Sequence, residues 1–206
     1  ATIKRVHQEL GGKSPHIILD DADLRAAVLQ NLSQIMLNAG QNCNAPTRML
    51  VPRSLMAEVA EIVSSQANTV SVGPAFSGAA IGPVVSKAQR DKIQALIQSG
   101  LDEGARLLMG GVGMPPNCSE GYFVKPTVFT DASNSMRIAR EEIFGPVLTI
   151  IAYDSDSHAI EIANDTEYGL AAYISGRNKS RIDTIVRQLK AGQVNVNNAP
   201  VDLYAP

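Results

Sequence analysis

The chain has 206 residues, of which 45% are hydrophobic and 18% charged, and its formal net charge is −2. This balance is typical of a globular protein, and the absence of a basic stripe argues against nucleic acid as a partner. No apolar run approaches the roughly 20 residues that a membrane-spanning helix needs, so we expect no membrane partner either. Two cysteines without an export signal predict reduced thiols and a cytoplasmic protein.

Short β-rich runs alternate with longer segments of helical periodicity. Asp21 or Asp23 is expected to cap the first helix and Gly40 to follow its end, while Ser86 and Gln89 form a capping box for the third. In chain order we expect strand 16–19, helix 24–36, strand 49–51, helix 55–67, strand 70–72, helix 86–104, strands 107–109, 122–129 and 147–153, helix 158–164, strand 171–174, helix 179–189 and strand 194–196.

This alternation predicts an α/β fold, a mainly parallel open sheet with helices on both faces in three layers, α/β/α. The run 147–151 is continuously apolar, as expected for a parallel strand that is buried on both sides. The segment 110–121 is rich in Gly and Pro and predicts a surface loop. No linker divides the chain, so residues 1–206 are expected to form a single domain.

Cys43 is the first candidate for chemistry. It lies in a polar loop between a predicted helix and a predicted strand, with Asn42 and Asn44 beside it. These neighbours carry no charge, and the end of a helix does not favour a thiolate. An activated Cys43 would therefore need a separate base or the charge of a cofactor. For an isolated loop cysteine, an unreactive thiol is the commoner interpretation.

Glu9 is the second candidate, because it precedes the pair Gly11-Gly12. Glycines allow a close backbone approach, and a carboxylate held beside such a turn can act as a general base. Taken alone, Glu9 is more simply read as a solvated surface residue. The three histidines are scattered along the chain, so we predict no metal site.

The segments 9–15 (ELGGKSP) and 40–48 (GQNCNAPTR), taken together, resemble the glutamate and cysteine signatures of the aldehyde dehydrogenase family. The resemblance extends over essentially the whole chain. Further segments follow the order found in that family, namely 72–74, 81–84, 104–105, 110–111, 126–128, 141–147, 164–170 and 192–197.

The resemblance implies a catalytic role for both candidates. Cys43 would attack the carbonyl carbon of an aldehyde, and its backbone N–H would help to hold the oxyanion of the thiohemiacetal. Loss of hydride would leave a thioester, which water activated by Glu9 would hydrolyse to the carboxylate. Asn42 and Asn44, which flank the nucleophile, would line the substrate tunnel.

The resemblance also implies NAD or NADP as the cofactor. Glu142 matches the residue that binds the hydroxyls of the nicotinamide ribose, and Leu10 matches one that approaches the nicotinamide ring. Phe144 would pack near the same ring, with ordinary core packing as the alternative. Gln89 and Lys92 match positions near the ribose on the adenine side, although a solvated helix face explains them equally well.

Members of this family are about twice as long as this chain. We therefore expect a catalytic-domain fragment, which lacks the N-terminal dinucleotide-binding domain and, because the chain stops at residues 203–206, the C-terminal oligomerisation segment. Such a fragment is expected to be inactive alone, whereas the full-length protein is expected to be a homodimer or homotetramer. The sequence does not choose between NAD and NADP or identify the aldehyde.

Two alternatives compete with the hydrolytic dehydrogenase. In a CoA-acylating member, CoA rather than water takes the acyl group, but such members generally lack the glutamate, so the presence of Glu9 favours water. A non-catalytic descendant of the fold is the second alternative. Such descendants often lose the nucleophile, whereas Cys43 is present.

Overall fold

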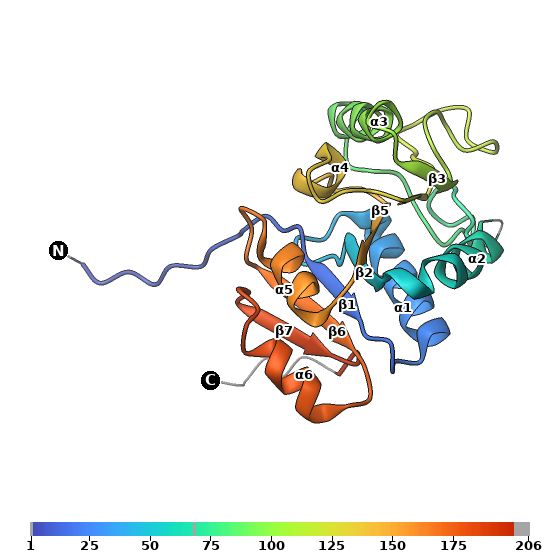
Figure 1. The fold of residues 1–206 in the computed structure, drawn as a ribbon. Coiled ribbons are helices and arrows are strands. Elements are labelled where there is room, and N and C mark those ends of the chain that lie inside the picture. Colours follow the sequence, from blue (N-terminus) through green and yellow to red (C-terminus); the bar gives the residue numbers. More distant parts are fainter. Residues whose placement is uncertain (1, 68, 200–206) are drawn as a thin grey trace.

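The computed structural model describes residues 2–67 and 69–199, so the expectation drawn from residues 203–206 lies outside the described part. Seven strands form one sheet in the order β3-β4-β5-β2-β1-β6-β7 (Figure 1). The strands are β1 (Pro15–Ile18), β2 (Arg48–Pro52), β3 (Arg106–Met109), β4 (Thr127–Thr130), β5 (Val147–Tyr153), β6 (Ala171–Ser175) and β7 (Gln193–Val196).

The sheet is mainly parallel, as the alternation of strands and helices predicts. Only β3 runs antiparallel to its neighbour β4; every other pair in the described sheet is parallel. The central strands β1 and β2 are buried along their whole length. Because β1 and β2 pair in parallel with each other and with β6 and β5, these four strands all begin at the same edge of the sheet.

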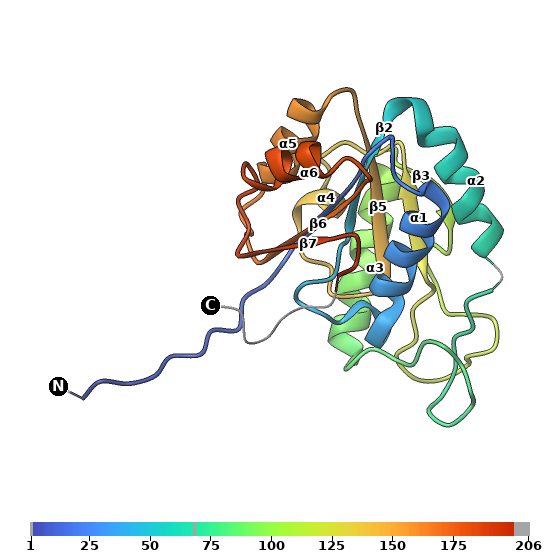
Figure 2. The same ribbon diagram turned by 90° about the horizontal axis from the view of Figure 1, so that it is seen from below.

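Helices cover both faces of the sheet, which confirms the predicted α/β class. Figure 2 shows α1 and α2 on one side and α4, α5 and α6 on the other, with α3 packed beside α4. Right-handed crossovers require this split, because the chain runs from β1 to β2 in one direction and from β5 to β7 in the other. The helices are α1 (Leu24–Met36), α2 (Met56–Gln66), α3 (Lys87–Asp102), α4 (Arg137–Arg140), α5 (Asp156–Asn164) and α6 (Lys179–Val186).

Three local expectations are wrong, and one short helix lies outside the predicted elements. The segment 70–72 forms only an isolated bridge between Val72 and Ile81. Pairing of the predicted strand 122–129 begins only after Pro126, which has no N–H to donate. The short helix α4 was not expected. The capping box is only half formed: Ser86 Oγ accepts from the N–H of Gln89, but within residues 69–199 the Ser86 N–H makes no bond to Gln89 Oε1.

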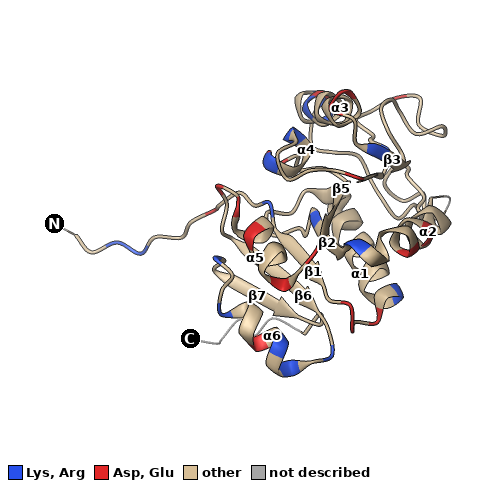
Figure 3. Ribbon diagram, in the orientation of Figure 1, with Lys and Arg blue, Asp and Glu red and all other residues tan. Residues whose placement is uncertain are grey.

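In the described part of the chain, the charged residues form no single-sign patch that the ribbon view of Figure 3 makes visible. Figure 3 shows Lys and Arg residues interspersed with Asp and Glu over the helices and strands. None of the helices formed by residues 2–67 and 69–199 combines the length and the apolar character needed to cross a bilayer. Within the same residues, no three His, Cys, Asp or Glu side chains gather as potential metal ligands.

Candidate active site

Three of the sequence motifs meet at the edge where the parallel strands begin. The glutamate segment precedes β1, the cysteine segment precedes β2, and residues 141–146 precede β5. These strands are neighbours in the order β5-β2-β1 and run parallel, so the segments that lead into them converge at one edge. The candidate site therefore lies at the amino ends of three adjacent strands.

Glycines allow these segments to touch backbone to backbone. A Cβ built on Gly12 would lie 1.9 Å from the carbonyl oxygen of Cys43. A Cβ on Gly40 would lie 2.1 Å from the carbonyl carbon and oxygen of Gly145, and Gly40 also has a φ of +73°. Real Cβ atoms essentially never approach within 3.0 Å, so only glycine fits at either position.

Cys43 is a half-buried free thiol in the loop that follows α1. The chain leaves the helix through Asn38, Ala39 and Gly40, which all have positive φ values and reverse its direction toward β2. Of the two predicted tunnel residues, Asn42 turns its amide back to donate to the Leu37 carbonyl at 3.3 Å. The backbone carbonyl of Asn44 accepts a hydrogen bond of 3.0 Å from the Tyr173 hydroxyl.

Glu142 lies against the Gly-Gly pair of the glutamate segment. Its Oε1 accepts a hydrogen bond of 3.0 Å from the backbone N–H of Gly12. Its Oε2 would be only 2.8 Å from a Cβ built on Gly11. This close fit holds the carboxylate beside the segment that contacts Cys43. The structure thus brings one predicted cofactor residue to the loop of Cys43.

Gln89 and Lys92 support the same segment from α3. The Gln89 amide donates to the carbonyls of Ile143 and Phe144, both at 2.9 Å, and Lys92 Nζ donates to the Glu142 carbonyl at 2.8 Å. Phe144 has a φ of 54°, a conformation that a bulky residue adopts only when its surroundings impose it. Both side chains therefore hold the backbone that presents Glu142 and Phe144.

Glu9 and Leu10 belong to residues 2–14, which precede β1 and form no helix or strand. Figure 1 shows this N-terminal segment leading away from the body of the molecule. Glu9 is exposed, and the Leu10 side chain is 52% exposed. Glu9 precedes Gly12 by three residues, a reach of about 10 Å at full extension. Gly12 contacts the backbone of Cys43, but Glu9 itself is exposed, and the approach of its carboxylate to the thiol stays a prediction.

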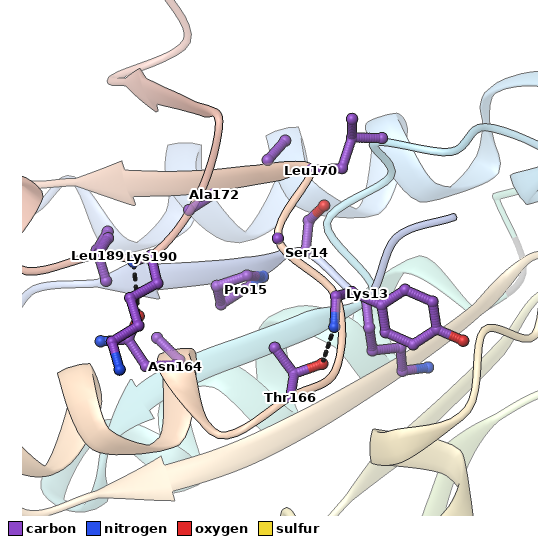
Figure 4. Close-up of a pocket in the computed structure, with 14 residues that line it drawn as sticks. Lys13, Ser14, Pro15, Asn164, Thr166, Leu170, Ala172, Leu189 and Lys190 are labelled. Atoms are coloured by element: carbon purple, nitrogen blue, oxygen red, sulfur yellow. Dashed lines mark hydrogen bonds between the residues drawn. The ribbon is translucent and has the colours of Figure 1, made fainter. Parts of the chain in front are cut away.

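Sequence reasoning missed Lys13, which lines a small pocket with Thr166 and Lys190 (Figure 4). Its side chain is only 1% exposed, and its Nζ has no hydrogen-bond partner among the residues described. Burial, reinforced by the charge of Arg48 and opposed by that of Glu142, lowers the pKa of Lys13 from 10.5 to about 7. A lysine after two glycines usually points to solvent, so no local signal predicts this burial.

The structural role of Arg48 was not predicted from the sequence either. Its Nε donates to the Lys13 carbonyl at 3.0 Å, and its other nitrogens donate to the carbonyls of Ile162 and Ala163 at 2.8 and 2.9 Å. Those two carbonyls belong to the last turn of α5, where a cation is favoured by the helix dipole. The guanidinium thus ties the glutamate segment to β2 and α5.

Comparisons with known proteins give the same family throughout. The model of the aldehyde dehydrogenase family matches residues 1–205. The 3-succinoylsemialdehyde-pyridine dehydrogenase of Pseudomonas sp is 48% identical over 206 residues, which is 100% of this chain and 43% of that protein. The crystal structure of an aldehyde dehydrogenase from Bartonella henselae has 47% identity and a TM-score of 0.93, covering 97% of this chain and 42% of that one.

A mutant of aldehyde dehydrogenase C from Pseudomonas syringae, in complex with NAD⁺ and octanal, also has a TM-score of 0.93. It is 45% identical and covers 97% of this chain and 41% of that one. The chain thus spans less than half the length of the relatives it matches. The family model, the identity of almost half the residues and the superposition of the fold agree, and the chain belongs to the aldehyde dehydrogenase family.

Proposed function

We propose that the full-length protein containing this chain oxidises an aldehyde to a carboxylate, with NAD or NADP as the hydride acceptor. The observation that carries this proposal is the close contact of three segments, in which Gly12 touches the backbone of Cys43 and donates to Glu142. The contact places the backbone of Cys43 and the carboxylate of Glu142, which suits a ribose, against the same glycine.

Cys43 is proposed as the nucleophile. Glu9 takes the proton of the thiol and passes it to solvent water. The thiolate sulfur then forms a bond to the carbonyl carbon, and the carbonyl oxygen becomes an oxyanion. The backbone N–H of Cys43 donates to no acceptor among residues 2–67 and 69–199, so it is available to this oxygen. After the carbon has lost its hydride, Cys43 carries the acyl group as a thioester.

Glu9 is proposed as the general base of the second half-reaction. Its carboxylate takes a proton from water, and the resulting hydroxide adds to the thioester carbon. The C–S bond then breaks, which releases the carboxylate product and restores the thiolate of Cys43. The exposed segment that carries Glu9 keeps this carboxylate in contact with water.

Glu142 is proposed to bind the cofactor, whose nicotinamide supplies the hydride acceptor. A carboxylate suits two neighbouring ribose hydroxyls because it accepts two hydrogen bonds. The fit is supported by the cradle at Gly11, where a Cβ would lie only 2.8 Å from Glu142 Oε2, and by the Gly12 N–H, which donates to Oε1. Leu10 and Phe144 are proposed to pack near the nicotinamide ring, while Gln89 and Lys92 hold the Glu142–Phe144 backbone in place.

The substrate class is proposed from the relatives. One is named for a semialdehyde carrying a pyridine ring, and another was crystallised with octanal. Both compounds carry an aldehyde group, which is the group that a cysteine nucleophile requires. NAD⁺ is the cofactor in the Pseudomonas syringae structure and in that of the 44% identical Mycobacterium tuberculosis enzyme. These relatives support NAD for the full-length protein.

The test is turnover of the natural full-length protein with octanal, followed by the absorbance of NADH. Cys43→Ala should lower kcat by about 10³-fold or more. Cys118, the second cysteine, is buried and belongs to none of the three segments that meet at the site, so Cys118→Ser should leave kcat within twofold. Glu9→Gln should release about one NADH per active site in a burst and then stall as the thioester accumulates. Normal turnover by Cys43→Ala would contradict the proposal.

Two further outcomes separate the alternatives. Free carboxylic acid as the product supports hydrolysis, whereas acyl-CoA formed only when CoA is added would establish the acylating reaction instead.

The 206-residue chain alone is expected to give no normal turnover, because the relatives it matches are more than twice as long. Robust NADH production by this chain would contradict that expectation.

A further inference from the structure

A buried polar network lies next to the loop of Cys43. His16 in β1 contacts Asn31 in α1, with 2.7 Å from Nδ1 to Oδ1, and Ser175 in β6, with 2.8 Å from Nε2 to Oγ. All three side chains are buried, with at most 6% exposed. A buried network of this kind is stable only when each member is satisfied, so its hydrogen bonds can be assigned.

The protonation state of His16 follows from its partners. The Asn31 amide nitrogen donates to the Pro46 carbonyl at 2.9 Å, so its oxygen faces His16 and can only accept. The Nδ1 of His16 must therefore carry the proton, and Nε2 accepts from the Ser175 hydroxyl. Burial lowers the pKa of His16 from 6.5 to about 4, which keeps this neutral form at physiological pH.

Tyr173 in β6 extends the network toward the nucleophile. Its ring lies beside that of His16, with 6.1 Å between the ring centroids. Its hydroxyl donates to the backbone carbonyl of Asn44, the residue after Cys43, at 3.0 Å. Burial raises the pKa of Tyr173, and the nearby charge of Cys43 adds to this effect. The phenol therefore stays a donor next to the reactive thiol.

The network ends at loop 42–47, where it holds two carbonyls, those of Asn44 and Pro46. Strand pairing does not need it, because β1 already pairs with β2 and β6 through backbone hydrogen bonds. Apolar side chains of similar volume would fill this space without the cost of burying polar groups. What the polar side chains do, and apolar ones could not, is hold the backbone that follows Cys43 through hydrogen bonds to the carbonyls of Asn44 and Pro46.

We propose that His16, Asn31, Tyr173 and Ser175 are positioning residues that hold loop 42–47 in the conformation that aims the Cys43 thiol. The proposal rests on the role of Cys43 as nucleophile. None of the four is proposed to touch substrate or cofactor. The loop is also held by the close approach to Gly12, by the bond from Asn42 to the Leu37 carbonyl and by the bond from the Thr149 N–H to the Thr47 carbonyl at 3.0 Å. Loss of the network would therefore free the stretch around Asn44 and Pro46, whose carbonyls it holds.

Tyr173→Phe in the natural full-length protein is the sharpest test, because it removes one hydroxyl and keeps the ring. Tyr153→Phe is the matched control. Tyr153 is buried in β5 and its hydroxyl donates to the Ile18 carbonyl at 2.8 Å, at the opposite end of β1 from Cys43. Both variants lose one buried tyrosine-to-carbonyl bond, but only the first loses a contact to the loop.

Tyr173→Phe should lower kcat by about tenfold with KM for octanal within twofold, because a loosened nucleophile reaches its attack geometry less often. Amide hydrogen exchange in loop 42–47 should become about tenfold faster. Tyr153→Phe should change neither quantity by more than twofold. Asn31→Ala should have a larger effect than Tyr173→Phe, since it also removes the acceptor of His16 Nδ1.

Unchanged exchange in loop 42–47 in Tyr173→Phe would overturn the proposal, and so would an equal fall in kcat in Tyr153→Phe. The exchange measurement does not depend on turnover. If Cys43→Ala retains activity, the proposed function fails, whereas faster exchange confined to loop 42–47 would still support a network that orders this loop. The two failures are therefore distinguishable.

Discussion

The contact between Gly12 and Cys43 allows one substitution to be worked out in detail. In Gly12→Ala, the new Cβ would lie 1.9 Å from the Cys43 carbonyl oxygen, whereas ordinary contact begins at 3.4 Å. One of the two backbones must move by about 1.5 Å, and a misplacement of about 1 Å near a reacting group lowers a rate by about 10²-fold. We therefore expect kcat of the full-length protein to fall by about two orders of magnitude.

The same clash should destabilise the fold by about 1–3 kcal/mol, as other overpacked sites do. Stability is measured by urea unfolding and activity by NADH production. Gly82→Ala is the control, because a Cβ built on Gly82 meets nothing within 4 Å and its φ is not in the positive range. If Gly12→Ala keeps kcat within twofold of the wild type, the close approach of the two segments does not govern the chemistry and the reasoning fails.

Three further predictions follow from the buried groups around the site. The pKa of Lys13 falls from 10.5 to about 7 on folding, so the unfolded chain binds more protons between these values and stability rises with pH across that window. Lys13→Met should therefore stabilise the protein by about 1–4 kcal/mol in urea unfolding at pH 6, and the gain should shrink toward pH 10; a gain independent of pH would contradict this. Arg48→Met leaves three carbonyls, that of Ile162 among them, without this donor, and should lower the free energy of unfolding by about 3 kcal/mol or more. Gln89→Met removes two bonds to the backbone at Phe144 and should raise the Kd for NAD about tenfold in a fluorescence titration of the full-length protein; an unchanged Kd would show that this support is not needed.

Local signals in the sequence predict much of the fold. The strand Val147–Tyr153 has the predicted bounds, because a run of large apolar residues between turn residues has few other stable conformations. The helix Leu24–Met36 begins after Asp23, whose side chain accepts from the N–H of Ala26 as a cap should. Periodicity and caps depend on neighbours within a few residues, so a single sequence contains them.

The motifs also identify the candidate residues but not their arrangement. Cys43 and Glu142 are far apart in the chain, and only the adjacency of β1, β2 and β5 brings their segments together at Gly12. The sequence places Gln89 in a capping box, but only the packing of α3 against residues 142–144 lets its Nε2 donate to the carbonyls of Ile143 and Phe144.

The sequence by itself determined the α/β class, most helices and strands, and which residues are candidates for chemistry, because these depend on local pattern. The tertiary structure alone decided that Lys13 is buried with no hydrogen-bond partner within the described part of the chain, and that Arg48 reaches the end of α5. It also decided that Tyr173 supports the loop of Cys43. These features depend on contacts between residues distant in the chain, and such contacts exist only once the strands have taken their order in the sheet.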